Sequence, residues 1–510
     1  MSTPDFPVEI WQHIASFLPP DFVETLFSVN RAFLQIALDT RYRVARVSNF
    51  DRYGIQRTLL DQDVRHRARS ILIDDDWEKA PVSTRSSEDK KERSGRFRSI
   101  LAKLSFQQRA HEIPATTTSS EEYYEALVLL VPELKGINEV DLRLYAPQKE
   151  QYSLKLRLAN VLLETAGSNL TKLSIHIGLE DLHQVFPNNP FLPNLSKFRI
   201  VLRASNETPN PESLLLAVVQ PFLVNQRDTV HSLELIGAHT VDPSVLLQSL
   251  PHFPRLVQLY LSHHIRNGDP EPRQGFTEFM KIHAPQLHDF RYHMRGSPFI
   301  HHYPPQWFVD ASNATLVDFP RITQLTVSVV PRFVFTSSNM ISHIQRYRAT
   351  LRTLRLQISP LSYTEILDLL ECISGSQSLQ SVNLLVDCLA PAVLGQFATH
   401  LPMLEDLTLN FVHTFVSVFI SPFSNPTRSP LEETHPDAIE QLKMWRLVSL
   451  SLVPVASRLA LLSEVRRAIV RSLPRVRSFC EVDPEEYASA ISDPGMHLTG
   501  VQAFNFGERY

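Results

Sequence analysis

The chain has 510 residues, 43% of them hydrophobic, with a formal net charge of -4 and a pI near 6.6. This length allows several globular domains or one long repeat array, and the slight acidic excess argues against a general nucleic-acid binder. Cys372, Cys388 and Cys480 are too far apart for a disulfide framework or a CxxC metal site, so we expect buried thiols in a reducing compartment.

The sequence also predicts neither a leader nor a membrane anchor. It lacks a basic region followed by an apolar run and a small-residue cleavage site, and it lacks a run of about 18 apolar residues. We therefore expect a cytoplasmic and/or nuclear protein with no membrane partner. Glycine is scarce, at 14 residues, and loops that cradle phosphate groups need glycine.

The first residues, from "FPVEIWQHIASFLPP" onward, predict three short helices. Pro7 suits the first position of a helix, and Pro19-Pro20 end it. Its apolar side chains recur at helical spacing and form one stripe of Ile10, Ile14, Phe17 and Leu18. We expect Asp21 to cap a second helix over 22–27. A unit this small rarely folds unaided, so its apolar stripe must be buried against the rest of the chain or another protein.

We expect Asn30 to cap a third helix that runs through "RAFLQIALD", with "TRYRVARV" as its extension. The expected division is a helical domain over 1–47, a connecting helical region over 48–129 and a repeat region over 130–510. Within the connecting region, residues 74–98 are Ser-rich and of mixed charge, which predicts a flexible loop.

One pattern, apolar-x-x-apolar-x-apolar, organises the rest of the chain. Its core alternates apolar and polar residues, as a half-buried strand does, and segments with helical spacing separate the copies. Many copies have a proline two residues before the first apolar position, which ends the preceding helix and directs the chain into an extended conformation. The copies begin at Ile137, Leu170, Leu195, Val230, Leu256, Leu287, Ile322, Leu351, Leu379, Leu404, Leu447 and, in degraded form, Val476, with an isolated early copy near Ala68.

Each unit therefore reads as strand, loop, helix and proline turn, an α/β arrangement. An eight-unit barrel closes after about 250 residues, and a doubly wound sheet favours longer buried strands and a glycine fingerprint. A solenoid fits better, with parallel strands on the concave face and helices on the convex face. Residues 421–436, rich in Pro and Ser, predict an inserted surface loop.

The opening stretch resembles an F-box, matching its spaced proline, aliphatic and aromatic positions, with Phe6 where Leu is usual and Asn30 where Cys is common. The repeats loosely resemble leucine-rich repeats, although they run longer and lack a regular Asn. Together they resemble the large fungal families of F-box proteins with such repeats. The resemblance implies a three-helix F-box followed by an irregular solenoid, and a surface that binds a Skp-type adaptor through Pro7, Ile10, Ile14, Phe17, Leu18, Phe22, Leu26, Val29 and Phe33.

In that family the adaptor links the protein to a cullin, and the repeats present a protein substrate for ubiquitin transfer. The resemblance therefore implies the substrate-recognition subunit of a Skp–cullin–F-box ubiquitin ligase. Two alternatives stay open: the helices only cap the solenoid, or the repeats form a binding scaffold that joins no ligase. We expect no enzyme activity, because the GxGxxG, GxxxxGK[ST], HExxH and GxSxG motifs are absent.

Histidines gather between His263 and His302, and we expect them in loops or at the surface, with no metal site and no cofactor. The substrate surface is expected where polar strand residues stack in rows on the concave face. Among these we select one aromatic and three arginines, because Tyr and Arg are enriched in binding hot spots. They are Arg199, Tyr260, Arg291 and Arg355. The mixed charge of these rows favours a protein partner over nucleic acid.

Overall fold

The structure, a computed structural model, describes residues 7–48, 65–74, 120–144, 149–187, 189–204, 210–237, 241, 243–265, 274–296, 317–330, 337–389, 391–414, 442, 445–454, 473, 475–476 and 478–479. The chain divides into two units, Met1–Val230 and His231–Tyr510. The predicted boundaries near residues 47 and 129 stay predictions. The predicted loops at 74–98, beyond Asp74, and at 421–436 lie outside the described residues.

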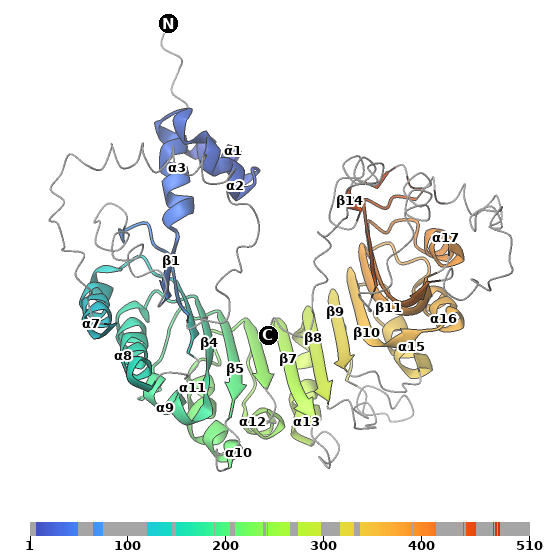
Figure 1. The fold of residues 1–510 in the computed structure, drawn as a ribbon. Coiled ribbons are helices and arrows are strands. Elements are labelled where there is room, and N and C mark those ends of the chain that lie inside the picture. Colours follow the sequence, from blue (N-terminus) through green and yellow to red (C-terminus); the bar gives the residue numbers. More distant parts are fainter. Residues whose placement is uncertain are drawn as a thin grey trace, which may run out of the picture. The chain divides into compact units, whose positions relative to one another are not determined.

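Unit 1 begins with the expected helices (Figure 1). The described helical segments of this unit are α1 (Val8–Ser16), α2 (Pro20–Thr25), η1 (Leu26–Ser28), α3 (Arg31–Tyr42), α7 (Ser120–Leu130), η2 (Val131–Glu133), α8 (Lys149–Ala166), η3 (Leu179–Asp181), α9 (Leu182–Val185), α10 (Pro211–Leu214), the π-helical η4 (Leu215–Val219) and α11 (Gln220–Asn225). A cluster of Ala15, Val23 and Phe33, with Trp11 and Leu18 packed against it, holds the first three helices together.

Two predicted caps of these helices differ from the structure, and one agrees. Pro7 precedes α1 as its N-cap residue and is not its first helical residue. Asp21 does not cap α2, because that helix already begins at Pro20, whose fixed φ suits a first turn. Asn30 caps α3 as predicted: its Oδ1 accepts a hydrogen bond from the backbone N–H of Phe33 at 2.8 Å.

The predicted extension of the third helix is wrong, since α3 ends at Tyr42 and a strand, β1, follows (Val44–Ser48). Ala45 and Val47 are 4% and 2% exposed, while Val44 and Arg46 are exposed, so the segment alternates as a half-buried strand does. It pairs in parallel with β2 (Ser70–Asp74), the copy of the pattern that begins near Ala68.

The predicted strands are confirmed in both units, and within each unit they pair in parallel. Unit 1 has β1, β2, β3 (Glu139–Arg143), β4 (Lys172–Gly178) and β5 (Lys197–Arg203), neighbours in that order. The described strands of unit 2, also in chain order, are β6 (Ser232–Gly237), β7 (Gln258–Ile265), β8 (Asp289–Gly296), β9 (Gln324–Val330), β10 (Thr353–Leu361), β11 (Ser381–Leu389), β12 (Asp406–Thr414), β13 (Ser449–Pro454) and β14 (Ser478–Phe479).

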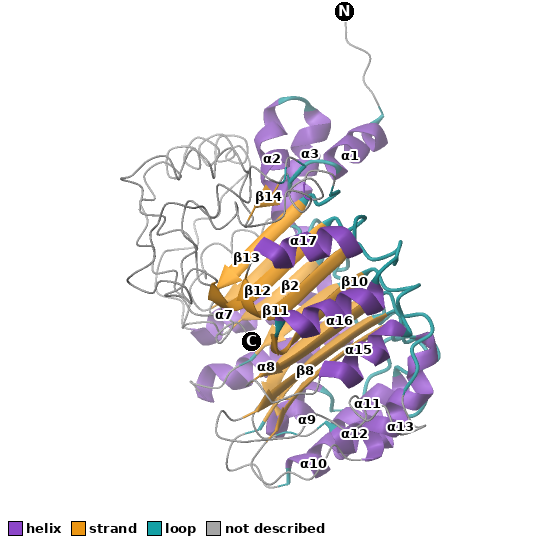
Figure 2. Cartoon of the chain, turned by 90° about the vertical axis from the view of Figure 1, so that its right-hand side faces the viewer, coloured by secondary structure: helices purple, strands orange, loops and turns teal. Residues whose placement is uncertain are grey.

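The described helices of unit 2 show how its sheet is covered. Figure 2 shows α15, α16 and α17 side by side across one face of strands β10 to β13. Strict sequential strand order excludes a doubly wound sheet, whose order reverses, and nine strands in a row exclude an eight-stranded barrel. The helical segments are α12 (Ser244–Ser249), α13 (Gln274–His283), η5 (Ala284–Gln286), α15 (Ser337–Gln345), α16 (Tyr363–Ile373) and α17 (Pro391–His400).

The recurring proline, in the copies that have one, occupies a tight turn before the strand. In "FPRL" the N–H of Leu256 donates to the carbonyl of Phe253 at 3.2 Å, which puts Pro254 at the second position of a four-residue turn. Proline suits this position because its φ is already fixed near the required value. The same hydrogen bond closes the turns at Leu192–Leu195, Ala284–Leu287, Phe319–Ile322 and Leu401–Leu404.

The first apolar residue of each copy is the point where the turn meets the core. Leu170, Leu195, Val230, Leu256 and Leu287 are all 0% exposed. At each strand start, one backbone carbonyl of the preceding strand accepts from two successive N–H groups, as Thr171 does from Ser196 and Lys197 at 2.9 and 3.0 Å. The turn and this shared acceptor therefore fix the register of each strand on its neighbour.

Candidate binding surfaces

Helix α1 carries two apolar stripes, and only one of them is buried in this chain. Trp11, Ala15 and Leu18 lie at helical spacing and pack into the core of the N-terminal helices. Ile10, Ile14 and Phe17 lie on another face and are 46%, 40% and 74% exposed. The sequence had placed Leu18 on the same stripe as Ile10 and Ile14, whereas the structure assigns it to the inward-facing stripe.

Further exposed apolar side chains follow along the same helical region. Val8 is 45% exposed, Phe22 of α2 is 51% exposed and Val29, after η1, is 58% exposed. We call Val8, Ile10, Ile14, Phe17, Phe22 and Val29 the apolar docking set. Burying a side chain of this size contributes about 1.5–3 kcal/mol, so leaving several in water forgoes a large gain unless a partner covers them.

The structure thus sorts the nine residues predicted to bind an adaptor. Pro7, Ile10, Ile14, Phe17, Phe22 and Val29 are exposed. Leu18 and Leu26 are half-buried against the helical core, and Phe33 is 4% exposed inside it, with its ring 5.3 Å from that of Trp11. Phe33 therefore supports the surface from below, while Val8 is an exposed neighbour that the sequence motif did not single out.

In unit 2 the strand register brings three of the four predicted substrate-binding residues into one row. Tyr260 of β7 lies beside Arg291 of β8, and Arg355 of β10 is separated from Arg291 by Thr326 of β9. Neighbouring strands are about 4.8 Å apart, so this stretch of the row spans roughly 14 Å. The complete row reads Glu234, Tyr260, Arg291, Thr326, Arg355, Asn383, Thr408 and Ser451.

Within this row Arg291 is already held by its own strand. Its Nε and Nη2 donate to the two carboxylate oxygens of Asp289 at 3.1 and 2.7 Å, and Asp289 is 6% exposed. The hydrogen bonds to Asp289 also raise the pKa of Arg291. Arg291 therefore serves first to neutralise a buried carboxylate, whereas Arg355 is exposed on the same row.

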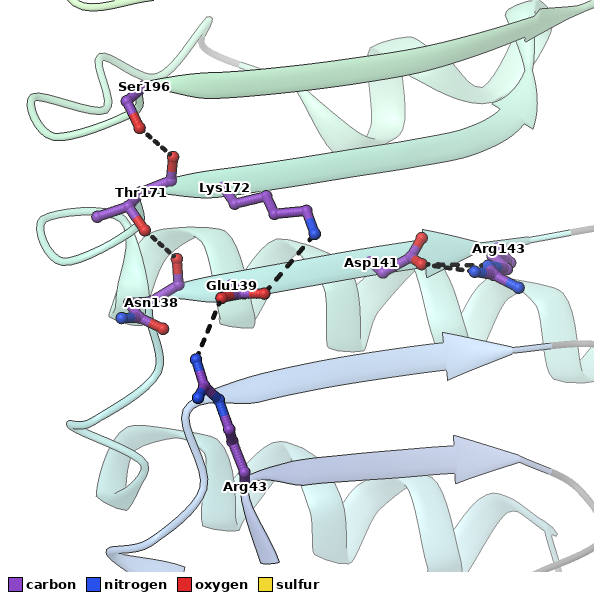
Figure 3. Close-up of polar contacts among 8 residues, drawn as sticks. All are labelled: Arg43, Asn138, Glu139, Asp141, Arg143, Thr171, Lys172 and Ser196. Atoms are coloured by element: carbon purple, nitrogen blue, oxygen red, sulfur yellow. Dashed lines mark hydrogen bonds and ion pairs between the residues drawn. The ribbon is translucent and has the colours of Figure 1, made fainter. Parts of the chain in front are cut away.

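The fourth residue, Arg199, lies on the polar face of unit 1. There the register places Arg46, Leu72, Asp141, Ser174 and Arg199 side by side on β1 to β5. Figure 3 shows the neighbouring ion pairs on the same face, with the helices behind the sheet. Glu139 lies between Arg43 at 3.9 Å and Lys172 at 3.7 Å, and Arg143 donates to Asp141 at 2.9 Å.

The histidines divide between core and surface. His283, which the sequence placed at the surface or in a loop, is 0% exposed at the end of α13, and its ring bonds the backbone at Phe253 and Phe279. His288 is exposed, and His301 and His302 lie outside the described residues. In the described part of the chain, no three His, Cys, Asp or Glu side chains converge as metal ligands.

No described helix combines the length and apolar character that crossing a bilayer requires. No protein-family profile matches the sequence, and neither does any curated protein. Among solved structures, the chain is similar to one in the crystal structure of the Rad7 and Elc1 complex in yeast. The TM-score is 0.31 at 13% identity, over 66% of this chain and 75% of that one. A TM-score this low does not establish a shared fold, so it carries no argument about function.

Proposed function

We propose that this protein is a substrate receptor of a Skp–cullin–F-box type ubiquitin ligase. Its N-terminal helices dock a Skp-type adaptor through the apolar docking set, the adaptor joins it to a cullin, and the polar faces of its sheets bind a protein substrate. The protein acts by binding and performs no chemistry itself. It works in the cytoplasm and/or nucleus, where such ligases meet their substrates.

The observation that supports this proposal is the second apolar stripe of α1. A helix that only capped the repeats would bury its apolar side chains against them, whereas Ile10, Ile14 and Phe17 point away from the helical core and remain exposed. These are also positions at which the sequence matches the F-box pattern. The side chains that are exposed in the structure are therefore the ones that match the F-box pattern in the sequence.

Two substitutions test the docking role without disturbing the fold. Ile10→Ala and Phe17→Ala remove exposed side chains, so the helical core of Trp11, Ala15 and Phe33 should remain intact. Anchor residues in an interface typically contribute about 2 kcal/mol or more, so each variant should bind a Skp-type adaptor at least about thirtyfold more weakly. The measurement is co-purification of adaptor with the full chain, followed by titration calorimetry.

The matched control is Phe191→Ala, which removes an equally large and 61% exposed ring far from the N-terminal helices in sequence. It should bind adaptor as the unmodified chain does. If Phe17→Ala co-purifies with adaptor as well as Phe191→Ala does, the docking surface lies elsewhere. If the unmodified chain retains no adaptor, the protein is a binding scaffold outside the ligase.

A further inference from the structure

The charges on the polar faces of the two units differ in a way that the net charge of -4 hides. The strands of unit 1 carry six Lys or Arg residues and three Asp or Glu residues, all on the polar face by strand alternation. The cations are Arg46, Arg143, Lys172, Lys197, Arg199 and Arg203, and the anions are Asp74, Glu139 and Asp141.

The strands of unit 2 have the opposite balance, with three arginines against four carboxylates. The excess of positive charge is therefore specific to unit 1, in a chain that is acidic as a whole. Such a local excess requires its own explanation, because it raises the electrostatic cost of assembling the sheet.

The excess is concentrated on two adjacent strands. β4 and β5 contain four cations and no Asp or Glu, while the three carboxylates lie on β2 and β3. Lys172 lies directly beside Lys197 in the register, one row before Arg199, and Arg203 lies near the end of the same face. We call Arg143, Lys172, Lys197, Arg199 and Arg203 the basic patch.

A histidine lies in the middle of the patch. His176 of β4 is in register with Arg143 of β3, and its ring is partly buried. Burial and the positive charges of Arg199, Arg143 and Arg203 lower the pKa of His176 to about 4, although Asp141 opposes them. Arginines from β3 and β5, the two strands that flank β4, therefore lie around His176.

We propose that the basic patch binds an oxyanion-bearing peptide segment of a partner protein, rich in carboxylate or phosphate groups. Guanidinium groups pair with both oxyanions in a bidentate manner, and the lysines add charge that does not depend on geometry. This inference deepens the proposed function by naming the substrate class, and it rests on that function for the identity of the partner as a substrate.

The composition of the face favours a peptide over a nucleic acid. The patch is bordered by Glu139 and Asp141, which would repel a phosphate backbone that continued across β3, and the whole chain is acidic. Arg143 already pairs with Asp141 and Lys172 with Glu139, so a short acidic segment meets chiefly Lys197, Arg199 and Arg203 of β5. An extended polyanion needs a longer continuous track of cations, which β1 to β3 do not provide.

Fluorescence anisotropy with the full chain and labelled peptides tests the proposal. The probes are a peptide of alternating glutamate and glycine, the same peptide with phosphoserine replacing glutamate, the same peptide with glutamine replacing glutamate, and a single-stranded RNA of equal length. We expect saturable binding of the glutamate or the phosphoserine peptide, weakened by added salt, and no binding of the glutamine peptide. The stronger of the first two probes identifies the oxyanion.

The double variant Lys197→Gln, Arg199→Gln should bind the acidic probe about tenfold more weakly, since each exposed charge pair contributes modestly. Arg255→Gln, an exposed arginine in the turn before β7 that belongs to no proposed binding surface, is the matched control and should change affinity less than about twofold. Arg199 is partly buried, so the thermal midpoint of each variant is measured too. Lys197→Gln alone, at an exposed site, replaces the double variant if that one unfolds.

Three results would overturn the proposal: no saturable binding of either acidic probe, an equal loss in Arg255→Gln, or tighter binding of RNA than of both peptides. These results are independent of adaptor capture. A chain that captures adaptor but binds no acidic peptide refutes only this inference. If the chain binds the peptide but captures no adaptor, only the proposal that the protein belongs to a ligase is refuted.

Discussion

His283 shows how a single residue ties neighbouring repeats together. Its Nε2 accepts the N–H of Phe253 at 3.0 Å, and its Nδ1–H donates to the carbonyl of Phe279 at 2.8 Å, so the ring is a neutral tautomer with both nitrogens used. Burial lowers the pKa of His283 to about 4, partly opposed by the hydrogen bond to Phe279 and assisted by nearby His252. A second proton would remove the acceptor that Phe253 requires.

The stability of unit 2 should therefore depend on pH. An unfolded histidine takes up its proton near pH 6.5, whereas folded His283 resists until about pH 4. The stabilisation is complete above about pH 6.5 and is lost as the pH falls toward 4, with a contribution on the order of 3 kcal/mol at most. Urea unfolding at several pH values should show a shallower slope over this window in His283→Gln. His288→Gln, at an exposed site, should keep the slope, and identical slopes in all three proteins would contradict the assignment.

At this scale the sequence predicted what depends on near neighbours. Asn30 was predicted to cap α3, and it does, because a cap needs only the N–H three residues on. The burial of His283 could not be predicted, because its partner Phe253 is 30 residues earlier in another repeat. Likewise, the spacing of apolar residues in α1 predicted an apolar stripe. It did not predict that these residues form two stripes, one in the core and one at the surface.

At the scale of the element, a proline turn leads into the strand in many of the repeats. Pro254→Ala should keep the hydrogen bond from Leu256 to Phe253 but give the unfolded chain more conformational freedom. We therefore expect the free energy of unfolding to fall by about 0.4–1 kcal/mol, measured as a lower urea midpoint. Arg255→Ala, the next and exposed position of the same turn, is the control and should change little. Equal midpoints for Pro254→Ala and the unmodified protein would mean that the turn does not rely on proline.

The strands were predicted because most copies of the repeat share a recognisable pattern. It consists of a first apolar residue, an alternation of apolar and polar residues and, in many copies, a preceding proline. β1 was not predicted as a strand, because its five residues directly follow a helical pattern and lack the first apolar residue of the repeat. One of the segments with helical spacing that separate the copies, over 211–226, does not form a single regular helix. It passes through the π-helical η4 just before Pro221, which has no N–H and whose ring crowds the preceding carbonyls. The alternation of apolar and polar residues predicted which side chains form the rows. It did not predict which charged side chains pair with each other, as Arg291 does with Asp289.

At the scale of the whole molecule, the proposed function assigns two tasks to different elements. The N-terminal helices, whose apolar side chains are exposed, would bind the adaptor, and the sheets carry polar rows whose chemistry changes along the chain, from the basic patch on β4 and β5 to Tyr260 and Arg355 in unit 2. Sequential stacking allows this change, because each repeat contacts mainly its neighbours and tolerates local variation in exposed residues.

Retention of a labelled acidic peptide on immobilised Skp-type adaptor would show directly whether one chain bridges an adaptor and an acidic partner. With the full chain present, we predict that the acidic peptide is retained and is released by salt. Phe17→Ala should lose both chain and peptide, whereas Lys197→Gln, Arg199→Gln should keep the chain and lose the peptide. Failure of the adaptor to retain the unmodified chain, or retention of peptide without the chain, would contradict this account.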